Sequence, residues 1–287
     1  MEPVTLLVQI AIIVLAPIAV GLLRGVDRKL TARMQNRRGP PVVQPFYDMV
    51  KLLSKKPILI NNLQVTFAAT SLLFQVAALA LFVAGGDLII AFFVSGAGAI
   101  FLVLGAFSVR SPYSYLGGQR ELLAILAYEP VLFLAILSLG MRGSFLVSDI
   151  QGGLLVDLPL VLLALIPVMV ILLEKSPYDV PAAHQELISG PYVEYSGPYL
   201  AIMEGARWFQ LAFVLGVITL FVWHDNTAVS LLGKAAIVLL VLLVTIVIDN
   251  ITARLTRERM VMFMLTVGIA LVAVNMIYLT IFPEGLI

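Results

Sequence analysis

Long apolar segments recur along the whole chain, and most charged residues lie in the polar stretches between them. A helix needs about 20 apolar residues to cross the hydrocarbon core of a bilayer, where every backbone polar group must be satisfied within the segment. Eight segments meet this requirement: 3–23, 66–84, 88–109, 122–139, 154–173, 199–222, 231–248 and 260–282. The pattern therefore predicts an all-α membrane protein with eight transmembrane helices, in which residues 1–287 form a single integral membrane domain.

Composition excludes several classes of protein. Hydrophobic residues make up 61% of the chain and charged residues 12%, and the mean hydropathy is +1.05, which excludes a water-soluble domain. The formal net charge of +1 leaves no surplus of cations for nucleic acid. Because the chain has no cysteine, it can hold no disulfide and no thiolate-bound metal or iron–sulfur cluster. Its two histidines, His184 and His224, lie at or beyond the ends of apolar segments, so we expect no haem, metal or other cofactor bound by this chain.

The distribution of lysine and arginine predicts the orientation. Fifteen of the 18 cations lie in four connections, at about 24–65, 110–121, 174–198 and 249–259. The connections on the opposite side carry only Arg142 and Lys234. By the positive-inside rule, the four basic connections are cytoplasmic loops and both termini lie outside the cell membrane.

The first of these loops contains an amphipathic segment, residues 44–56. Its apolar side chains fall at i, i+3, i+4 and i+7 (Phe46, Met49, Val50 and Leu53), and Asp48, Lys51 and Lys55 fall on the other side. This spacing predicts a helix lying in the membrane interface. It could rest on anionic lipid, or it could be a docking platform for a soluble partner.

Acidic residues occur where the membrane disfavours them. Glu129 lies within the fourth predicted span and is followed by Pro130, and the sixth span contains Glu204 and Arg207 at i, i+3. An ionisable group inside a span is expensive and is a functional hypothesis by default, here a proton relay. Pairing that serves only helix packing is the alternative. The third loop is also acidic, with Glu174, Asp179, Glu186 and Glu194.

Three ordered blocks carry a family resemblance. The first joins residues 26–29 (VDRK), 34–40 (MQNRRGP) and 44–53 (QPFYDMVKLL), the second places Arg120 nine residues before Glu129, and the third is the acidic loop 174–195. In these blocks the chain resembles the membrane subunit shared by respiratory complex I and energy-converting membrane-bound nickel–iron hydrogenases. Only three residues separate Gly39-Pro40 from Gln44, a compact form similar to the hydrogenase branch and its sulfur-reducing relatives.

The resemblance implies a membrane anchor and proton-coupling subunit of a ferredoxin-linked hydrogenase or sulfur-reducing complex. It implies that an iron–sulfur small subunit and a hydrogenase-like large subunit, which would carry the iron–sulfur clusters and a nickel–iron centre, dock on the cytoplasmic side. Antiporter-like membrane subunits would lie alongside in the lipid. The implied docking residues are Arg28, Lys29, Arg33, Gln35, Arg37, Arg38, Gln44, Asp48 and Lys51. The expected relay residues are Glu129, Glu174, Asp179, Glu186, Glu194, Glu204, Arg207 and Arg120.

The sequence is also compatible with three other functions. The chain could be the quinone-binding membrane subunit of a complex I-type dehydrogenase, a freestanding proton-coupled transporter, or a passive anchor. It contains no phosphate-binding loop, no glycine-rich dinucleotide fingerprint and no plausible catalytic triad, so we expect no catalysis by this chain alone.

Overall fold

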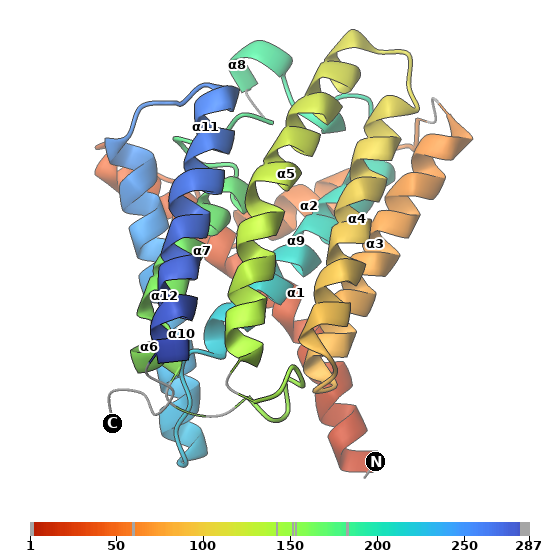
Figure 1. Ribbon diagram of the computed structural model, residues 1–287. Helices are drawn as coiled ribbons and strands as arrows, with labels where there is room; N and C mark the ends of the chain where they lie inside the picture. The colour runs from red at the N-terminus through yellow and green to blue at the C-terminus, as the bar shows by residue number, and fades with distance from the viewer. Residues whose placement is uncertain are drawn as a thin grey trace.

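The computed structural model describes residues 3–58, 61–141, 143–150, 152, 154–181 and 184–281. Within these ranges the chain is helical and has no β-strand (Figure 1). Seven helices in this part of the chain have the length and apolar composition needed to cross a membrane. They are α1 (Pro3–Met34), α3 (Asn62–Val83), α4 (Leu88–Phe107), α5 (Pro112–Gly140), α9 (Pro198–Thr219), α10 (Thr227–Ile251) and a C-terminal rod of α11 (Arg257–Phe263), η2 (Met264–Gly268) and α12 (Ile269–Ile281). The predicted all-α membrane class is confirmed.

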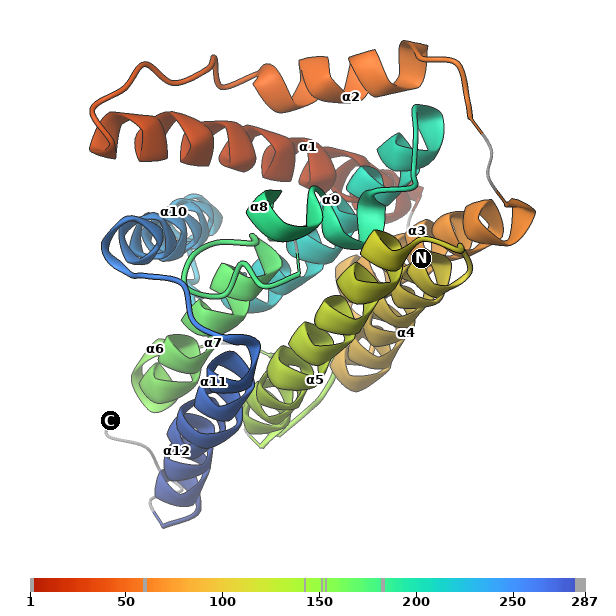
Figure 2. The same ribbon diagram turned by 90° about the horizontal axis from the view of Figure 1, so that it is seen from above.

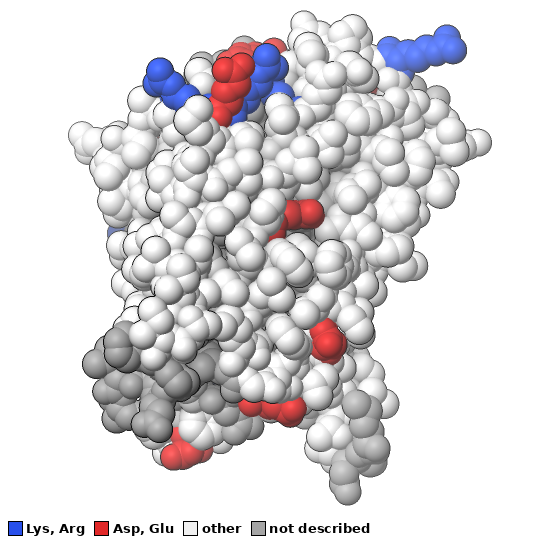
Figure 3. All heavy atoms as spheres, viewed as in Figure 1, with Lys and Arg blue, Asp and Glu red and all other residues white. Residues whose placement is uncertain are grey.

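The helices form one bundle with two distinct ends. The start of α1 and the end of α12 lie at one end, and α8 (His184–Leu187) lies at the other (Figure 1). On the face shown in Figure 3, lysine and arginine gather at the α8 end. Within the bundle, α3 packs against α4 and α9, and α5 packs against α4, α7 (Pro159–Leu172) and α12. The apolar core therefore lies between α5, α7 and α9.

The expected fifth span, 154–173, is divided in two. It consists of α6 (Leu154–Asp157) and α7, separated by a break at Leu158, because Pro159 disfavours helical geometry at the residue before it. Asn275 of α12 satisfies the backbone groups that the break releases. Its amide donates to the carbonyl oxygen of Asp157 at 2.7 Å, and its carbonyl oxygen accepts from the N–H of Leu160 at 2.9 Å.

Several helices extend beyond their predicted boundaries. Residues 24–34 continue α1 and residues 112–121 begin α5. The loops predicted at 24–65 and 110–121 are therefore shorter in the structure. At the start of α5, Pro112 favours helix initiation because its fixed φ suits the first helical position. Gly25 permits the loop after α1 to fold back on the helix, since a Cβ at this position would overlap the backbone carbonyl of Val42. Charged side chains expected in loops therefore lie on helices with defined faces.

Helix α2 (Gln44–Ser54) occupies most of the predicted amphipathic segment. It runs alongside α1 on one side of the bundle (Figure 2) and also contacts α9. Phe46 packs its ring edge-on against Trp208 of α9, with centroids 5.5 Å apart. Val50 and Leu53, on the same predicted apolar face, remain exposed. The helix thus docks on the bundle through part of its apolar face and presents the rest outward.

Candidate functional site: two buried ion-pair clusters

The acidic third loop folds onto a buried arginine of α9. Arg207, whose side chain is only 9% exposed, lies 2.7 Å from the carboxylate of Glu174, at the start of the loop, and 3.4 Å from that of Glu204. Its guanidinium also stacks on the ring of Tyr192, 5.0 Å from the centroid. Glu204 pairs in turn with Arg24 of α1 at 2.7 Å. We call these four charged residues the Arg207 cluster, and it links α1, α9 and the third loop through alternating charges.

A second cluster begins at the next residue of the chain. The ammonium of Lys175 lies 3.0 Å from Asp27 of α1 and 3.0 Å from Asp249 of α10. Asp249 also accepts a hydrogen bond from the backbone N–H of Ser176 at 3.0 Å. We call these ionised residues the Lys175 cluster. Because Glu174 and Lys175 are consecutive, the start of the loop is held by two neighbouring residues of opposite charge, one in each cluster.

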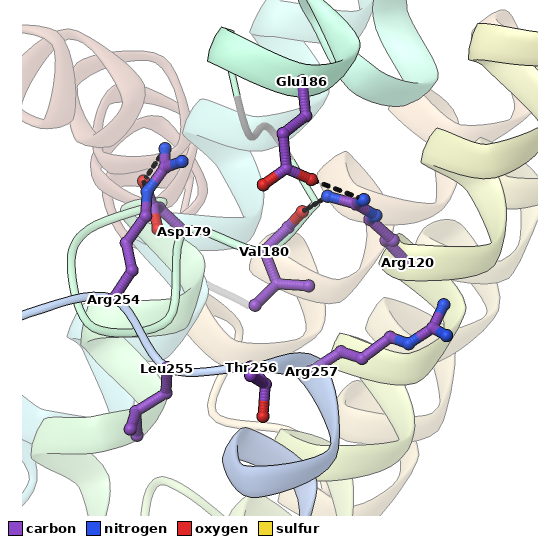
Figure 4. Close-up of a pocket in the computed structure, with 8 residues that line it drawn as sticks. All are labelled: Arg120, Asp179, Val180, Glu186, Arg254, Leu255, Thr256 and Arg257. Carbon is purple, nitrogen blue, oxygen red and sulfur yellow. Dashed lines mark hydrogen bonds and ion pairs between the residues drawn. The ribbon is translucent and has the colours of Figure 1, made fainter.

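Two ion pairs fix the outer part of the loop. Arg120 of α5 lies 2.6 Å from Glu186 of α8, and Arg254, which follows α10, pairs with Asp179. Figure 4 shows these pairs approaching one another from different elements, around a cavity of about 240 Å³. The hydrogen bond and the charge of Arg120 lower the pKa of Glu186 below its usual value. Three residues expected in the relay, Arg120, Asp179 and Glu186, thus hold the outer part of the loop in place.

Glu129 lies apart from these clusters. It is near the middle of α5, is half-buried, and faces Gly96 of α4, where an added Cβ would approach a carboxylate oxygen to 2.9 Å. Figure 3 shows acidic atoms at mid-height among mostly uncharged atoms. No ion pair to Glu129 or to Glu194 is formed within the described ranges. The helix runs uninterrupted through Pro130.

The predicted docking residues divide into two groups. Asp48 accepts hydrogen bonds from Arg28 at 2.9 Å and from Gln44 at 3.0 Å, which ties α2 to α1. Gln35 contacts Asn250 and Arg37. The other group is less constrained: Lys29 is half-buried, and the exposed members are Arg33, Arg38 and Lys51. The exposed members are available for contact with another molecule.

A narrow cavity of about 140 Å³ lies between α1, α2 and α9. It is lined by side chains that include Arg24, Arg28, Glu204 and Trp208. The indole N–H of Trp208 is buried and has no hydrogen-bond partner among the residues described. The cavity connects the surface of α2 with the Arg207 cluster.

Residues of the Lys175 cluster were not among the predicted site residues, and neither was Arg24. In the sequence, Lys175 and Arg24 contribute only to the distribution of cations that predicts the orientation. The i, i+3 spacing of Arg24 and Asp27 is nevertheless a signal that the two residues share a helix face. His184 opens α8, but its side chain lies outside the described residues. His224 is exposed and accepts a hydrogen bond from the N–H of Asn226. Among the described residues, no group of three acids or histidines could hold a metal ion.

Comparison with known proteins places this architecture in a family. The family model described as NADH dehydrogenase matches residues 7–280. The chain belongs to this family. Hydrogenase-4 component C of Escherichia coli is 33% identical over 206 residues, which cover 65% of this chain and 64% of that protein. The chain thus matches less than two thirds of that relative's length.

Two further relatives match more fully. Formate hydrogenlyase subunit 4 of Escherichia coli is 27% identical, over 83% of this chain and 85% of that protein. A chain of the membrane-bound sulfane sulfur reductase, an archaeal respiratory membrane complex, has a TM-score of 0.81 and 27% identity. That match covers 96% of this chain and 99% of the other. The resemblance to the family shared by complex I and membrane-bound hydrogenases is confirmed, and this family member is a multi-pass membrane protein.

Proposed function

We propose that this chain is the membrane subunit that couples electron transfer in a soluble arm to proton movement in the membrane. The observation that carries the proposal is the position of Arg207. It is a buried arginine within a span, and it is bound at once by the first acid of the third loop and by an acid of its own helix. Loop and membrane domain therefore share one cation.

Because Glu174 and Glu204 share this cation, a movement of the third loop would change the electrostatic environment of Glu204. A buried charge is costly unless its partners stay in place. If Glu174 moved away from Arg207, the guanidinium would interact more strongly with Glu204, and the charge balance of α1 and α9 would change. Such a displacement is the two-state element that coupling requires. Asp179, Glu186, Glu194 and Arg120 would carry the displacement of the loop, and Glu129 would exchange protons on the α4–α5 face.

The wider arrangement follows from the same proposal. The basic end of the bundle faces the cytoplasm and both termini lie outside, because lysine and arginine are concentrated in the connections at that end. The divided segment α6–α7 forms an eighth span, and its released backbone groups are already satisfied by α12. Helix α2 lies in the membrane interface, where its exposed Val50 and Leu53 contact lipid.

The partners are proposed from the relatives. A small subunit with iron–sulfur clusters and a hydrogenase-like large subunit would dock on the end of α1, the segment 35–43, α2 and the third loop, where exposed cations include Arg33, Arg38 and Lys51. Antiporter-like membrane subunits would lie beside the bundle. The acceptor would be protons or a sulfur species, and ferredoxin would be the donor.

Reconstitution of the complex tests the proposal. The complex is isolated through this chain in mild detergent, its subunits are identified, and it is placed in liposomes where redox turnover and proton movement are both measured. We expect Glu129→Gln to preserve assembly and electron transfer but to lower the number of protons moved per electron. Glu258→Gln, at an exposed acid of α11, is the control. An unchanged ratio in Glu129→Gln would favour a passive anchor.

A quinone-binding subunit is the second candidate, because a cavity of about 140 Å³ beneath α2 is lined by side chains that include Arg24, Glu204 and Trp208. Inhibition of turnover by quinone-site inhibitors, or a quinone bound in this cavity, would establish it. A freestanding transporter would instead move ions when the purified chain alone is placed in liposomes.

A further inference from the structure

An apolar groove follows the outer surface between α5 and α11. It consists of two adjoining cavities of about 450 Å³ and 300 Å³, which share Leu123 and Arg257. Four of the other lining residues are apolar, Leu116 and Leu122 of α5 and Val261 and Met262 of α11, and the rest are Gln119, Arg120 and Glu258. Both helices belong to segments long enough to span a membrane. The groove therefore presents an apolar channel on a membrane-facing surface.

Arg257 stands at the polar end of this groove. It is the first residue of α11 and is exposed. It also lines the charged cavity that holds Arg120 and Arg254. Those two arginines are paired with acids, whereas no ion pair to Arg257 is formed by any residue that the structure describes.

The side chain of Arg257 points away from the acids of the charged cavity. Figure 4 shows it extending from the start of α11 toward α5, away from Asp179 and Glu186. Its neighbour Glu258 contributes to the rim of the larger cavity and would repel a second negative charge there. The free guanidinium thus lies on the α5 side of the groove, where Gln119 adds a polar group.

We propose that this groove binds an anionic phospholipid. Its phosphate lies at Arg257, with Gln119 as a second donor, and one acyl chain follows Leu122, Leu123, Val261 and Met262 into the bilayer. An unpaired cation beside an apolar channel, at the end of two spans, has the charge and polarity that complement such a lipid. The site shares Arg120 and Arg257 with the charged cavity of Figure 4, lies apart from the Arg207 and Lys175 clusters, and does not depend on the coupling role.

Photocrosslinking tests the site in the intact membrane complex. The complex is placed in phosphatidylcholine nanodiscs with a trace of phosphatidylglycerol or phosphatidylcholine carrying a diazirine on one acyl chain, and adducts are mapped by mass spectrometry. We expect residues 116–123 and 257–262 to be labelled about fivefold more by the phosphatidylglycerol probe, the change associated with one basic residue near an anionic surface. Arg257→Gln should remove this excess.

Arg259→Gln is the matched control, because Arg259 is also exposed, lies two residues away and lines neither cavity. Retention of the excess in this variant supports a specific site. Three results would overturn the proposal: equal labelling by both probes in the unmodified protein, the same loss in Arg259→Gln, or crosslinking of the groove to a neighbouring subunit in place of lipid.

Discussion

Replacing Lys175 by methionine tests whether the Lys175 cluster stabilises the folded protein. Methionine retains much of the length of the lysine side chain but removes the cation between Asp27 and Asp249. Both carboxylates lie 3.0 Å from the ammonium, so the oxygens that contact it are no more than about 6 Å apart. The side chain of Asp27 is only 8% exposed, which limits screening by water. Lys175→Met therefore leaves two buried acids facing each other.

The magnitude follows from this geometry. Two like charges about 6 Å apart repel by about 3 kcal/mol at an effective dielectric constant of about 20. Removing one partner of a buried ion pair typically costs about 3–5 kcal/mol. We therefore expect Lys175→Met to lower the free energy of unfolding by at least about 3 kcal/mol. Adding Asp27→Asn removes one of the two facing charges and should restore a large part of this loss.

Reversible denaturation of the purified full chain in detergent micelles measures both variants. Lys51→Met is the control, because Lys51 is exposed on α2, and we expect it to change the free energy of unfolding by no more than about 0.5 kcal/mol. An unchanged free energy of unfolding in Lys175→Met would contradict repulsion between Asp27 and Asp249. Further destabilisation of the Lys175→Met background by Asp27→Asn would contradict it as well.

Three further predictions address other parts of the fold. Because Arg120 lowers the pKa of Glu186, their contact stabilises the loop above the unfolded carboxyl pKa of about 4.5 and is lost as the pH falls below it. Hydrogen-exchange protection of α8 should fall more on acidification in the unmodified chain than in Glu186→Gln, which retains only the Arg254–Asp179 pair. Asn275→Leu should lower the free energy of unfolding by about 1–3 kcal/mol, because the backbone groups at the α6–α7 break lose their partners; an unchanged denaturation midpoint would contradict this. Gly25→Ala should prevent the first loop from closing on α1 and reduce the yield of folded protein, measured by size-exclusion chromatography. Gly205→Ala, where the nearest side-chain atom is 3.8 Å away, should fold normally.

The sequence was sufficient for those features that depend on local chemistry. Each span must satisfy its own backbone hydrogen bonds in lipid, so apolar length alone located the seven long helices. The contact between Glu204 and Arg207 could also be predicted, because residues three apart share a helix face. The motifs at 26–53 and 174–195 were specific enough to indicate the family, which the comparisons confirm.

Only the tertiary structure decided which charges meet. Arg207 and Glu174 lie 33 positions apart in the chain, and Lys175 is separated from Asp27 by 148. Their pairing depends on how α1, α9 and α10 pack and rotate, and apolar spans give no signal of that rotation because lipid accepts any apolar face. The continuation of α1 to Met34 then placed one expected loop cation, Arg24, in the Arg207 cluster. The pattern of apolar and polar residues thus determined which segments cross the membrane. Helix packing determined which charged side chains form ion pairs, because long-range contacts depend on geometry that no local spacing encodes.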